Sequence, residues 1–236
     1  MIPDFLLIMT AIAVLENISP QLWTAGRQTD LSVDGYQVLH AATQEAMRSE
    51  VLRRLPKGYE FLDYEYTIQG TALTTWHRDV TSGQQYHGTT HPTYTVIRYE
   101  IEGDLLTVIP RSHATFPFSI DRSQIINGTV GTTILFNADL LHAGAPNRGG
   151  TARQYKVAHR DDLERLSHLA GFRVTKTGEN APMTNMDWAK RVLSWQWAWF
   201  LNLPAVAHIL QDRQPTGTVG ALLQRMANQD FFNRDA

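Results

Sequence analysis

Apolar and polar residues alternate in short runs through the middle of the chain, from about residue 59 to residue 160. In the run 62–68, for example, Leu62, Tyr64, Tyr66 and Ile68 alternate with polar residues, which is the pattern of a half-buried strand. Turns rich in Gly, Pro and Asn separate these runs, and no helical spacer lies between them. The pattern predicts an antiparallel sandwich or barrel, with the jelly roll as the natural candidate. The expected strands are 37–39, 62–68, 72–76, 94–102, 105–109, 132–136 and 153–159.

Helical patterns flank this region on both sides. Residues 43–55 predict a helix capped by Thr43 and stopped by Pro56. Phe5 to Leu15 is apolar but shorter than the ~20 residues of a membrane span, so we expect a buried or interface helix there. After residue 160 the pattern predicts a helix over 161–170, a loop over 171–186 and a last helix from Met186 or Asp187. The expected organisation is a single, mainly β domain, with a core at about 59–160 and helical flanks at 1–58 and 161–236, in a cytoplasmic protein.

The last helix carries aromatic side chains around its whole circumference, not along one stripe. They are Trp188, Trp195, Trp197, Trp199 and Phe200. One interpretation places this helix between the barrel and the N-terminal helix. The other is a membrane-surface or oligomer contact, because exposed aromatic patches need a partner.

The amino-acid composition limits which kinds of functional site the chain can form. The 236 residues contain no cysteine, which excludes disulfides, thiolate metal sites, iron–sulfur clusters and Cys nucleophiles. Any metal must therefore be held by nitrogen and oxygen ligands, and nine histidines are present. The formal net charge of −2 gives no general attraction to nucleic acid, and we expect no nucleic-acid partner.

Two His-x-Asp triplets are candidates for such a site. In both His77-Arg78-Asp79 and His159-Arg160-Asp161, the histidine and aspartate are two residues apart, so they share a side of a strand or its exit turn. Only the first is followed by a histidine at a later strand boundary, His142. Two imidazoles and one carboxylate form the ligand set of non-haem iron(II) oxygenases, which leaves coordination positions open.

Arg153 adds an anion site to this hypothesis. Within 153–159, alternation places Arg153 on one face with Tyr155 and Val157, and we expect that apolar face to point inward. An inward arginine needs an anion, and a dicarboxylate co-substrate such as 2-oxoglutarate would supply one. The alternative is a surface arginine at the start of a strand.

The sequence resembles the phytanoyl-CoA dioxygenase-like branch of the iron(II)/2-oxoglutarate oxygenases over roughly residues 30–160. The matching pieces occur in order, and the step from His142 to Arg153 has the usual spacing of that family. Two positions depart from the family's pattern, because Arg111 stands where a second glycine is usual and Gly144 stands where a hydroxyl residue is common. The pieces are Leu31–Leu39, Trp76–Asp79, Gly103 with Val108–His113, and Gly131–Phe136 followed by Leu141-His142 and 147–153.

This resemblance implies a double-stranded β-helix (jelly-roll, cupin-like) core. It also implies iron(II) on His77, Asp79 and His142, with 2-oxoglutarate on Arg153 and further co-substrate contacts at Tyr64 and Thr95. The implied reaction uses O2, with ascorbate as a reductant, to hydroxylate an unactivated C–H bond of a small, lipid-like or natural-product substrate, and it yields succinate and CO2. Related halogenases have a small residue at the Asp79 position, so the carboxylate favours hydroxylation.

Two alternatives stay open. A cupin-like metal enzyme would share the fold without using 2-oxoglutarate. A non-catalytic barrel that docks to a membrane through the Trp-rich helix would bind no iron. His87 and His91 lie in a polar loop that we expect to form a lid, and we expect His113 to make structural hydrogen bonds.

Overall fold

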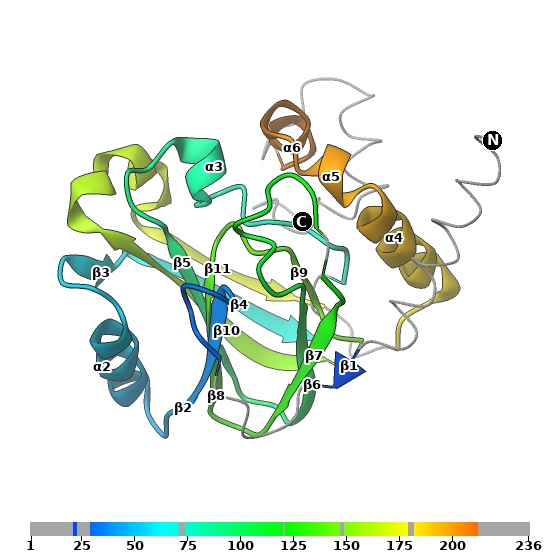
Figure 1. Cartoon of the computed structure of the whole chain (residues 1–236). Helices are drawn as coiled ribbons and strands as arrows, with labels where there is room; N and C mark the ends of the chain where they lie inside the picture. Colours follow the sequence, from blue (N-terminus) through cyan, green and yellow to red (C-terminus); the bar gives the residue numbers. More distant parts are fainter. Residues whose placement is uncertain are drawn as a thin grey trace.

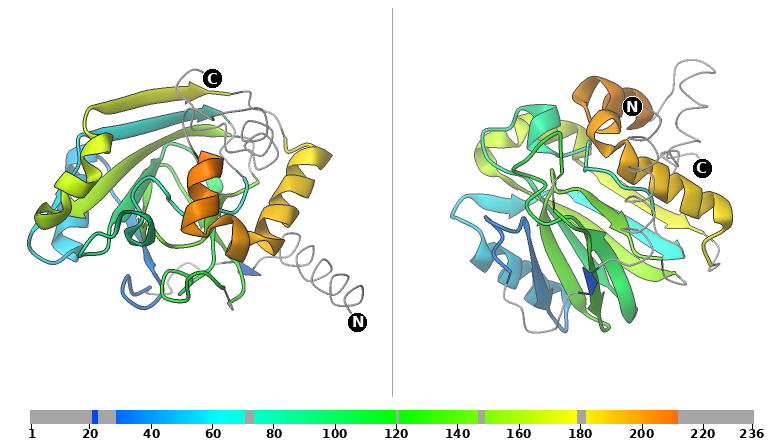
Figure 2. Two further views of the ribbon diagram at one scale, coloured as in Figure 1. Left: turned by 90° about the horizontal axis from the view of Figure 1, so that it is seen from above. Right: turned by 45° about the vertical axis from the view of Figure 1, so that its right-hand side comes forward.

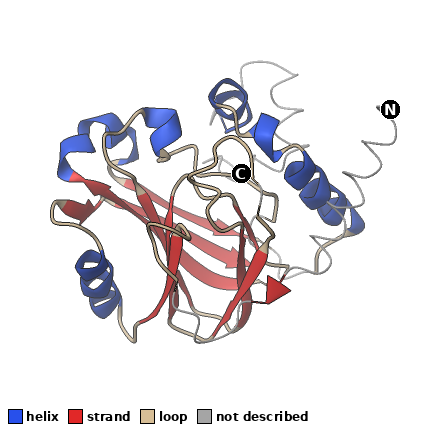
Figure 3. Ribbon diagram, in the orientation of Figure 1, coloured by secondary structure: helices blue, strands red, loops and turns tan. Residues whose placement is uncertain are grey.

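Two β-sheets face one another and enclose an apolar core, with helices on their outer sides (Figures 1 and 3). The computed structural model describes residues 21–22, 29–70, 74–119, 121–146, 149–178 and 182–211. The large sheet has the strand order β11-β4-β10-β5-β8-β2, and the short strand β3 also pairs with β10. The small sheet has the order β1-β7-β6-β9.

The strand bounds of the large sheet are β2 Tyr36–His40, β3 Tyr59–Phe61, β4 Tyr64–Gly70, β5 Tyr94–Tyr99, β8 Thr132–Asn137, β10 Gly150–His159 and β11 Phe172–Thr177. Those of the small sheet are β1 Gln21–Leu22, β6 Gly103–Val108, β7 Gln124–Gly128 and β9 His142–Gly144. His77 extends the small sheet through an isolated antiparallel bridge to His142.

The chain crosses repeatedly between the two sheets from β4 to β10. It passes from β4 in the large sheet to His77 in the small one, then to β5, to β6 and β7, to β8, to β9 and finally to β10. This winding is a double-stranded β-helix, so the jelly-roll core expected from the sequence is confirmed.

The core between the sheets follows from the two-residue alternation. Ile97 and Tyr99 of β5 meet Leu106 and Val108 of β6, with Phe136 of β8 beside them, and all five are buried. Alternation within the run 94–102 predicts that Ile97 and Tyr99 share one face, and the structure confirms that this face points into the core. A second cluster lies on the outer side of the large sheet, where it is covered by α2 (Gln44–Arg54). The side chain of Thr43 accepts a hydrogen bond from the N–H of Ala46, which confirms the predicted cap.

Several flanking predictions are wrong. The expected loop 171–186 contains β11, which pairs in parallel with β4. Together with β2, this strand extends the sheet beyond the expected limits of 59–160. The expected helix 161–170 is two 3₁₀ segments, η1 (Arg160–Asp162) and η2 (Glu164–Leu169). In the expected strand 72–76, the described residues 74–76 form no strand. A short helix, α3 (Gln84–His87), lies in the loop before β5.

The last helix begins as predicted but is divided into three. These are α4 (Asn185–Gln196), α5 (Ala198–Leu201) and α6 (Pro204–Gln211), which lie together on one side of the molecule (Figure 2). A capping box formed by Thr184 and Asp187 starts α4. Pro204 is the first residue of α6, where its missing N–H costs least.

In these helices polar side chains are buried and several aromatic side chains are exposed, which reverses the usual distribution. The polar residues Arg191 and Ser194 are buried, whereas Trp197, Trp199 and Phe200 are 40–43% exposed. The Trp199 ring also stacks on Phe118, at 6.1 Å between ring centres. The inner face of this segment is therefore packed against the barrel, while its outer face presents aromatic rings. The expected contact with the N-terminal helix lies outside the described residues.

The expected helix at Phe5 to Leu15 lies outside the described residues. Within the part of the chain that the structure describes, no helix is long and apolar enough to span a membrane.

Candidate metal centre

His77 and His142 are held side by side by their own backbones. The N–H of His77 donates to the carbonyl of His142 at 2.9 Å, and the N–H of His142 donates back at 3.0 Å. The two rings lie 4.4 Å apart between centres, and both side chains are buried. Residues 65 positions apart thus form one pair because two strand segments of the small sheet are neighbours.

The tautomer of each imidazole is fixed by a backbone carbonyl. Nδ1 of His77 lies 2.8 Å from the carbonyl oxygen of Thr75, and Nδ1 of His142 lies 2.8 Å from that of Leu140. A carbonyl only accepts, so each Nδ1 carries the hydrogen and each Nε2 keeps its lone pair. This second contact is the one that metal-ligating histidines typically make.

Asp79 completes the group. Its Oδ1 lies 3.8 Å from Nε2 of His142, and its backbone N–H donates to the carbonyl of Ala138 at 2.9 Å. One ligand atom from each of His77, Asp79 and His142 lies within 4.8 Å of the others, and all three residues are buried. The structure therefore brings together all three residues that the sequence singled out.

This donor set fits iron(II). Two neutral imidazoles and one carboxylate, with no further His, Asp or Glu in the group among the described residues, would leave coordination positions of such an ion open to other ligands. The fit rests on the preformed arrangement of the donors.

Burial sets the charge state of the ligands. It lowers the pKa of His142 to about 3 and also lowers the pKa of His77, so both rings are neutral at neutral pH. Burial alone would raise the pKa of Asp79. The Lys156 ammonium, through its charge and its hydrogen bond, outweighs burial and holds that pKa below its usual range, so the carboxylate is ionised.

Lys156 is a buried cation beside the metal ligands that the sequence interpretation missed. Its Nζ donates to Oδ2 of Asp79 at 2.7 Å and to Oγ1 of Thr95 at 2.8 Å, and the residue is only 1% exposed. The Thr95 hydroxyl in turn donates to the same Asp79 oxygen. Oδ2 of Asp79 is thus occupied by two donors, while Oδ1 is turned toward His142.

Tyr64 and Thr95 both face inward, as the sequence predicted. Tyr64 is buried and stacks on Phe172 at 4.9 Å between ring centres, and Nζ of Lys156 lies 5.8 Å from the centre of the Tyr64 ring. Contacts of these two residues with a co-substrate remain a prediction.

The prediction that Arg153 faces inward is wrong. The residue is 39% exposed on its side chain and pairs with Glu100 at 3.2 Å and with Glu65 at 3.7 Å. Strand register explains this placement, because Arg153 lies opposite Arg98 of β5, whose face points outward, whereas Lys156 lies opposite Thr95. Glu65 of β4 and Glu100, directly after β5, therefore supply the anion that the sequence interpretation assigned to a co-substrate.

Alternation alone could not decide between the two faces of β10. Tyr155 and Val157 are apolar and buried, but they pack outward against α2. Lys156 between them is buried on the inner side. Both faces of this strand are covered, and only the pairing register shows which one meets the metal ligands.

Side chains of the C-terminal helices make hydrogen bonds to the backbone on both sides of His77. Ser194 Oγ accepts from the N–H of Trp76 at 2.8 Å, and Asn202 Oδ1 accepts from the N–H of Arg78 at 2.9 Å. The Arg191 guanidinium donates to the carbonyls of Thr74 and Gly144, at 2.7 and 2.8 Å, and to Thr107 Oγ1 at 2.9 Å. Nothing in the sequence pattern pointed to these contacts across more than forty residues.

A second group of possible ligand atoms is formed by His91, His159 and Asp161. The His91 and His159 rings stack at 3.9 Å, so their in-plane lone pairs do not converge well. Nδ1 of His159 also accepts from the N–H of Asp161, and this hydrogen bond caps the N-terminus of η1. This group is better explained as a structural cluster, and His87 similarly stacks on His168.

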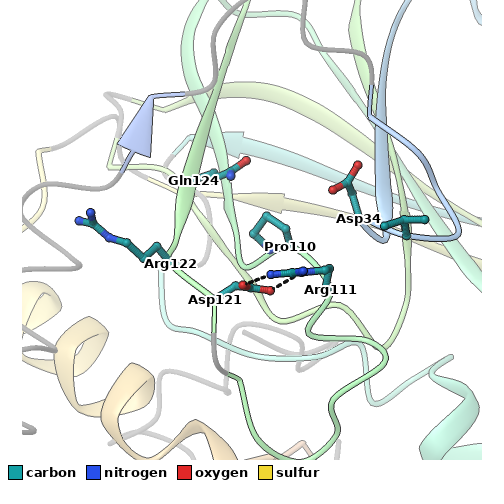
Figure 4. A pocket seen from close by; sticks show the side chains of 7 residues that line it. Asp34, Pro110, Arg111, Asp121, Arg122 and Gln124 are labelled. Carbon is teal, nitrogen blue, oxygen red and sulfur yellow. Dashed lines mark hydrogen bonds and ion pairs between the residues drawn. The ribbon is translucent and has the colours of Figure 1, made fainter.

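A pocket of about 440 Å³ lies away from the three metal ligands, and Figure 4 shows its lining side chains. Arg111 and Asp121 form an ion pair across it. Arg111 has φ of 63°, a conformation that favours glycine, which agrees with the usual glycine at this position in the resembling family. The lining residues are Val33, Asp34, Pro110, Arg111, Asp121, Arg122 and Gln124.

No protein-family model and no curated protein matches this sequence. Among solved structures, it is similar to SnoN, described as the non-heme alpha ketoglutarate dependent epimerase from nogalamycin biosynthesis. The identity is 13% and the TM-score 0.40, over 74% of this chain and 83% of that one. EvdO2 from Micromonospora carbonacea var. aurantiaca gives 11% identity and a TM-score of 0.38, over 59% of this chain and 91% of that one.

HygX from Streptomyces hygroscopicus, with nickel, 2-oxoglutarate and hygromycin B bound, gives 13% identity and a TM-score of 0.34, over 55% of this chain and 84% of that one. A match to EvdMO1 spans only 30% of that chain. TM-scores below 0.5 are too low to transfer a fold or an activity. The fold and the site of this protein therefore rest on its own strand order and residues.

Proposed function

We propose that this protein is an iron(II)- and 2-oxoglutarate-dependent oxygenase that hydroxylates a C–H bond of a small molecule. One observation carries the proposal: two buried imidazoles, each held at Nδ1 by a backbone carbonyl, and one ionised carboxylate have ligand atoms within 4.8 Å of one another. His77, Asp79 and His142 would hold iron(II) and would leave it able to bind further ligands.

The balanced reaction is substrate C–H plus 2-oxoglutarate plus O2 to alcohol plus succinate plus CO2. When bound, iron(II) and 2-oxoglutarate would supply the activation of O2 that the reaction needs. The protein contributes position and charge. Backbone carbonyls orient His77 and His142, and Lys156 with Thr95 fixes one oxygen of Asp79.

The outward placement of Arg153 favours a second candidate, a metal enzyme of the cupin type that does not use 2-oxoglutarate. The same ligands would then serve another substrate, and the buried Lys156 would serve only to neutralise Asp79.

The two candidates differ in one product. Purified protein reconstituted with iron(II), 2-oxoglutarate, ascorbate and O2 should form succinate, even slowly without substrate. His142→Ala should abolish this formation, whereas the matched change His40→Ala, at an exposed histidine outside the group, should not. Absence of both succinate formation and 2-oxoglutarate binding in the wild-type protein would support the cupin-type alternative.

A further inference from the structure

The position that supplies a cation to the centre is occupied by Lys156 and not by Arg153. On β10 the two residues are three apart and therefore on opposite faces of the strand. Arg153 is paired with Glu100 and Glu65 on the outer surface, at 3.2 and 3.7 Å. Lys156 is the cation that the same strand directs into the barrel.

Lys156 has one carboxylate partner among the described residues, and that partner is a metal ligand. Its Nζ lies 2.7 Å from Oδ2 of Asp79, both side chains are at most 4% exposed, and its other polar contact is the Thr95 hydroxyl. A buried ammonium is unfavourable unless an anion compensates it. The negative charge of Asp79 must therefore compensate Lys156 and also serve a bound metal.

Formal charges show what this sharing implies. The charges of Asp79 and Lys156 cancel, and an imidazole that binds a metal is neutral, so the four side chains carry no net charge. A divalent metal alone would leave a charge of +2 in a buried site, which is costly at low effective dielectric. A metal together with a doubly negative oxo acid would return the net charge to zero.

We propose that Lys156, and not Arg153, is the cation that pairs electrostatically with the 2-oxo dicarboxylate, so that metal and co-substrate bind to this centre cooperatively. This inference rests on the proposed function and adds to it the residue that selects a dianionic co-substrate. The metal and the oxo acid neutralise each other's charge in the buried site. Each should therefore tighten the binding of the other by the same factor.

The test measures binding under conditions without turnover. Manganese(II) replaces iron(II) under nitrogen, and its dissociation constant is measured by calorimetry without oxo acid, with 2-oxoglutarate and with pyruvate. Pyruvate has the same chelating end but one charge fewer. The variants are Lys156→Met and the matched Arg153→Met, with Lys156→Gln as a second variant in case the methionine form does not fold.

In the wild-type protein, 2-oxoglutarate should tighten manganese binding at least tenfold, and pyruvate should tighten it less. Lys156→Met should bind manganese alone more tightly, by about fivefold or more, and should lose most of the coupling to 2-oxoglutarate. Arg153→Met should behave as the wild type does. A metal-induced rise in melting temperature that is larger in Lys156→Met than in the wild type would support the same conclusion.

Unchanged coupling in both Lys156 variants, or loss of coupling in Arg153→Met, would overturn the inference while leaving the proposed function standing. A wild-type protein that binds manganese but not 2-oxoglutarate would overturn the inference and the proposed co-substrate together.

Discussion

The backbone N–H of Arg78, between His77 and Asp79 of the candidate metal centre, donates to the side-chain oxygen of Asn202 at 2.9 Å. The two residues are 124 positions apart, and both are buried. Asn202 follows α5 and also donates from Nδ2 to the carbonyl of Ala198 at 2.8 Å. The C-terminal helices are thus part of the support of the metal centre.

Asn202→Ala should weaken metal binding several-fold and lower the free energy of unfolding by about 1–3 kcal/mol, because the buried N–H of Arg78 loses its acceptor. The matched change Asn202→Asp keeps an acceptor for Arg78 but loses the donor to Ala198. It should keep near-wild-type metal affinity even if the protein is less stable. Calorimetric titration with manganese(II) measures the affinity, and equal weakening in both variants would contradict this role.

Arg191 should be needed for its shape as well as its charge. No carboxylate among the described residues pairs with it, and its guanidinium reaches three oxygen acceptors on three segments of the small-sheet side. Arg191→Met should lower the free energy of unfolding by about 2–4 kcal/mol because these buried acceptors lose their donor. Arg191→Lys should recover less than half of this loss, since an ammonium does not reproduce the planar fork. Urea denaturation measures both, and full recovery by lysine would contradict the prediction.

Asp139 should make stability depend on pH. Burial raises the pKa of its carboxyl to about 6, although the N–H of Gln85 and the charge of Arg78 act against it. The native state therefore holds this proton at a higher pH than the unfolded chain does. Its contribution to stability is fully present below about pH 4 and is lost as pH rises through about 6.

Asp139→Asn removes this titration, so the variant should gain stability relative to the wild type by about 2 kcal/mol between pH 4 and pH 7. Urea denaturation at the two pH values gives the difference. A difference between variant and wild type that does not change with pH would show that Asp139 is not the titrating group.

The ion pairs of Arg153 should matter little. Its side chain is 39% exposed, and its partners Glu100 and Glu65 are also partly exposed. A double-mutant cycle between Arg153→Ala and Glu100→Ala should give a coupling free energy below about 1 kcal/mol, which high salt should reduce further. A coupling above about 2 kcal/mol that persists in 1 M salt would show that the pair is more than a surface contact.

The sequence was sufficient for the core and for the convergence of His77, Asp79 and His142. Alternation identified the inner face of β5, and the positions of His77, Asp79 and His142 relative to strands identified their convergence. It was not sufficient for β10, because both of its faces are buried and the apolar face proved to be the one against α2. Only the register that pairs Lys156 with Thr95 shows that the Lys156 side chain lies on the inner face of β10.

The C-terminal region shows a second limit. Its aromatic residues drew attention, but the contacts that reach the metal-bearing segment come from Arg191, Ser194 and Asn202. Such contacts depend on how helices dock against a sheet, and a periodic pattern does not encode which polar side chain meets which distant backbone group.

Iron(II) stoichiometry after anaerobic reconstitution tests the central claim most directly. The wild-type protein should bind one iron(II) per chain, and His77→Ala and His142→Ala should each lose it. His159→Ala, which alters the second group of possible ligand atoms, should keep it. Full binding in His142→Ala, or loss of binding in His159→Ala, would contradict the assignment of the metal to His77, Asp79 and His142.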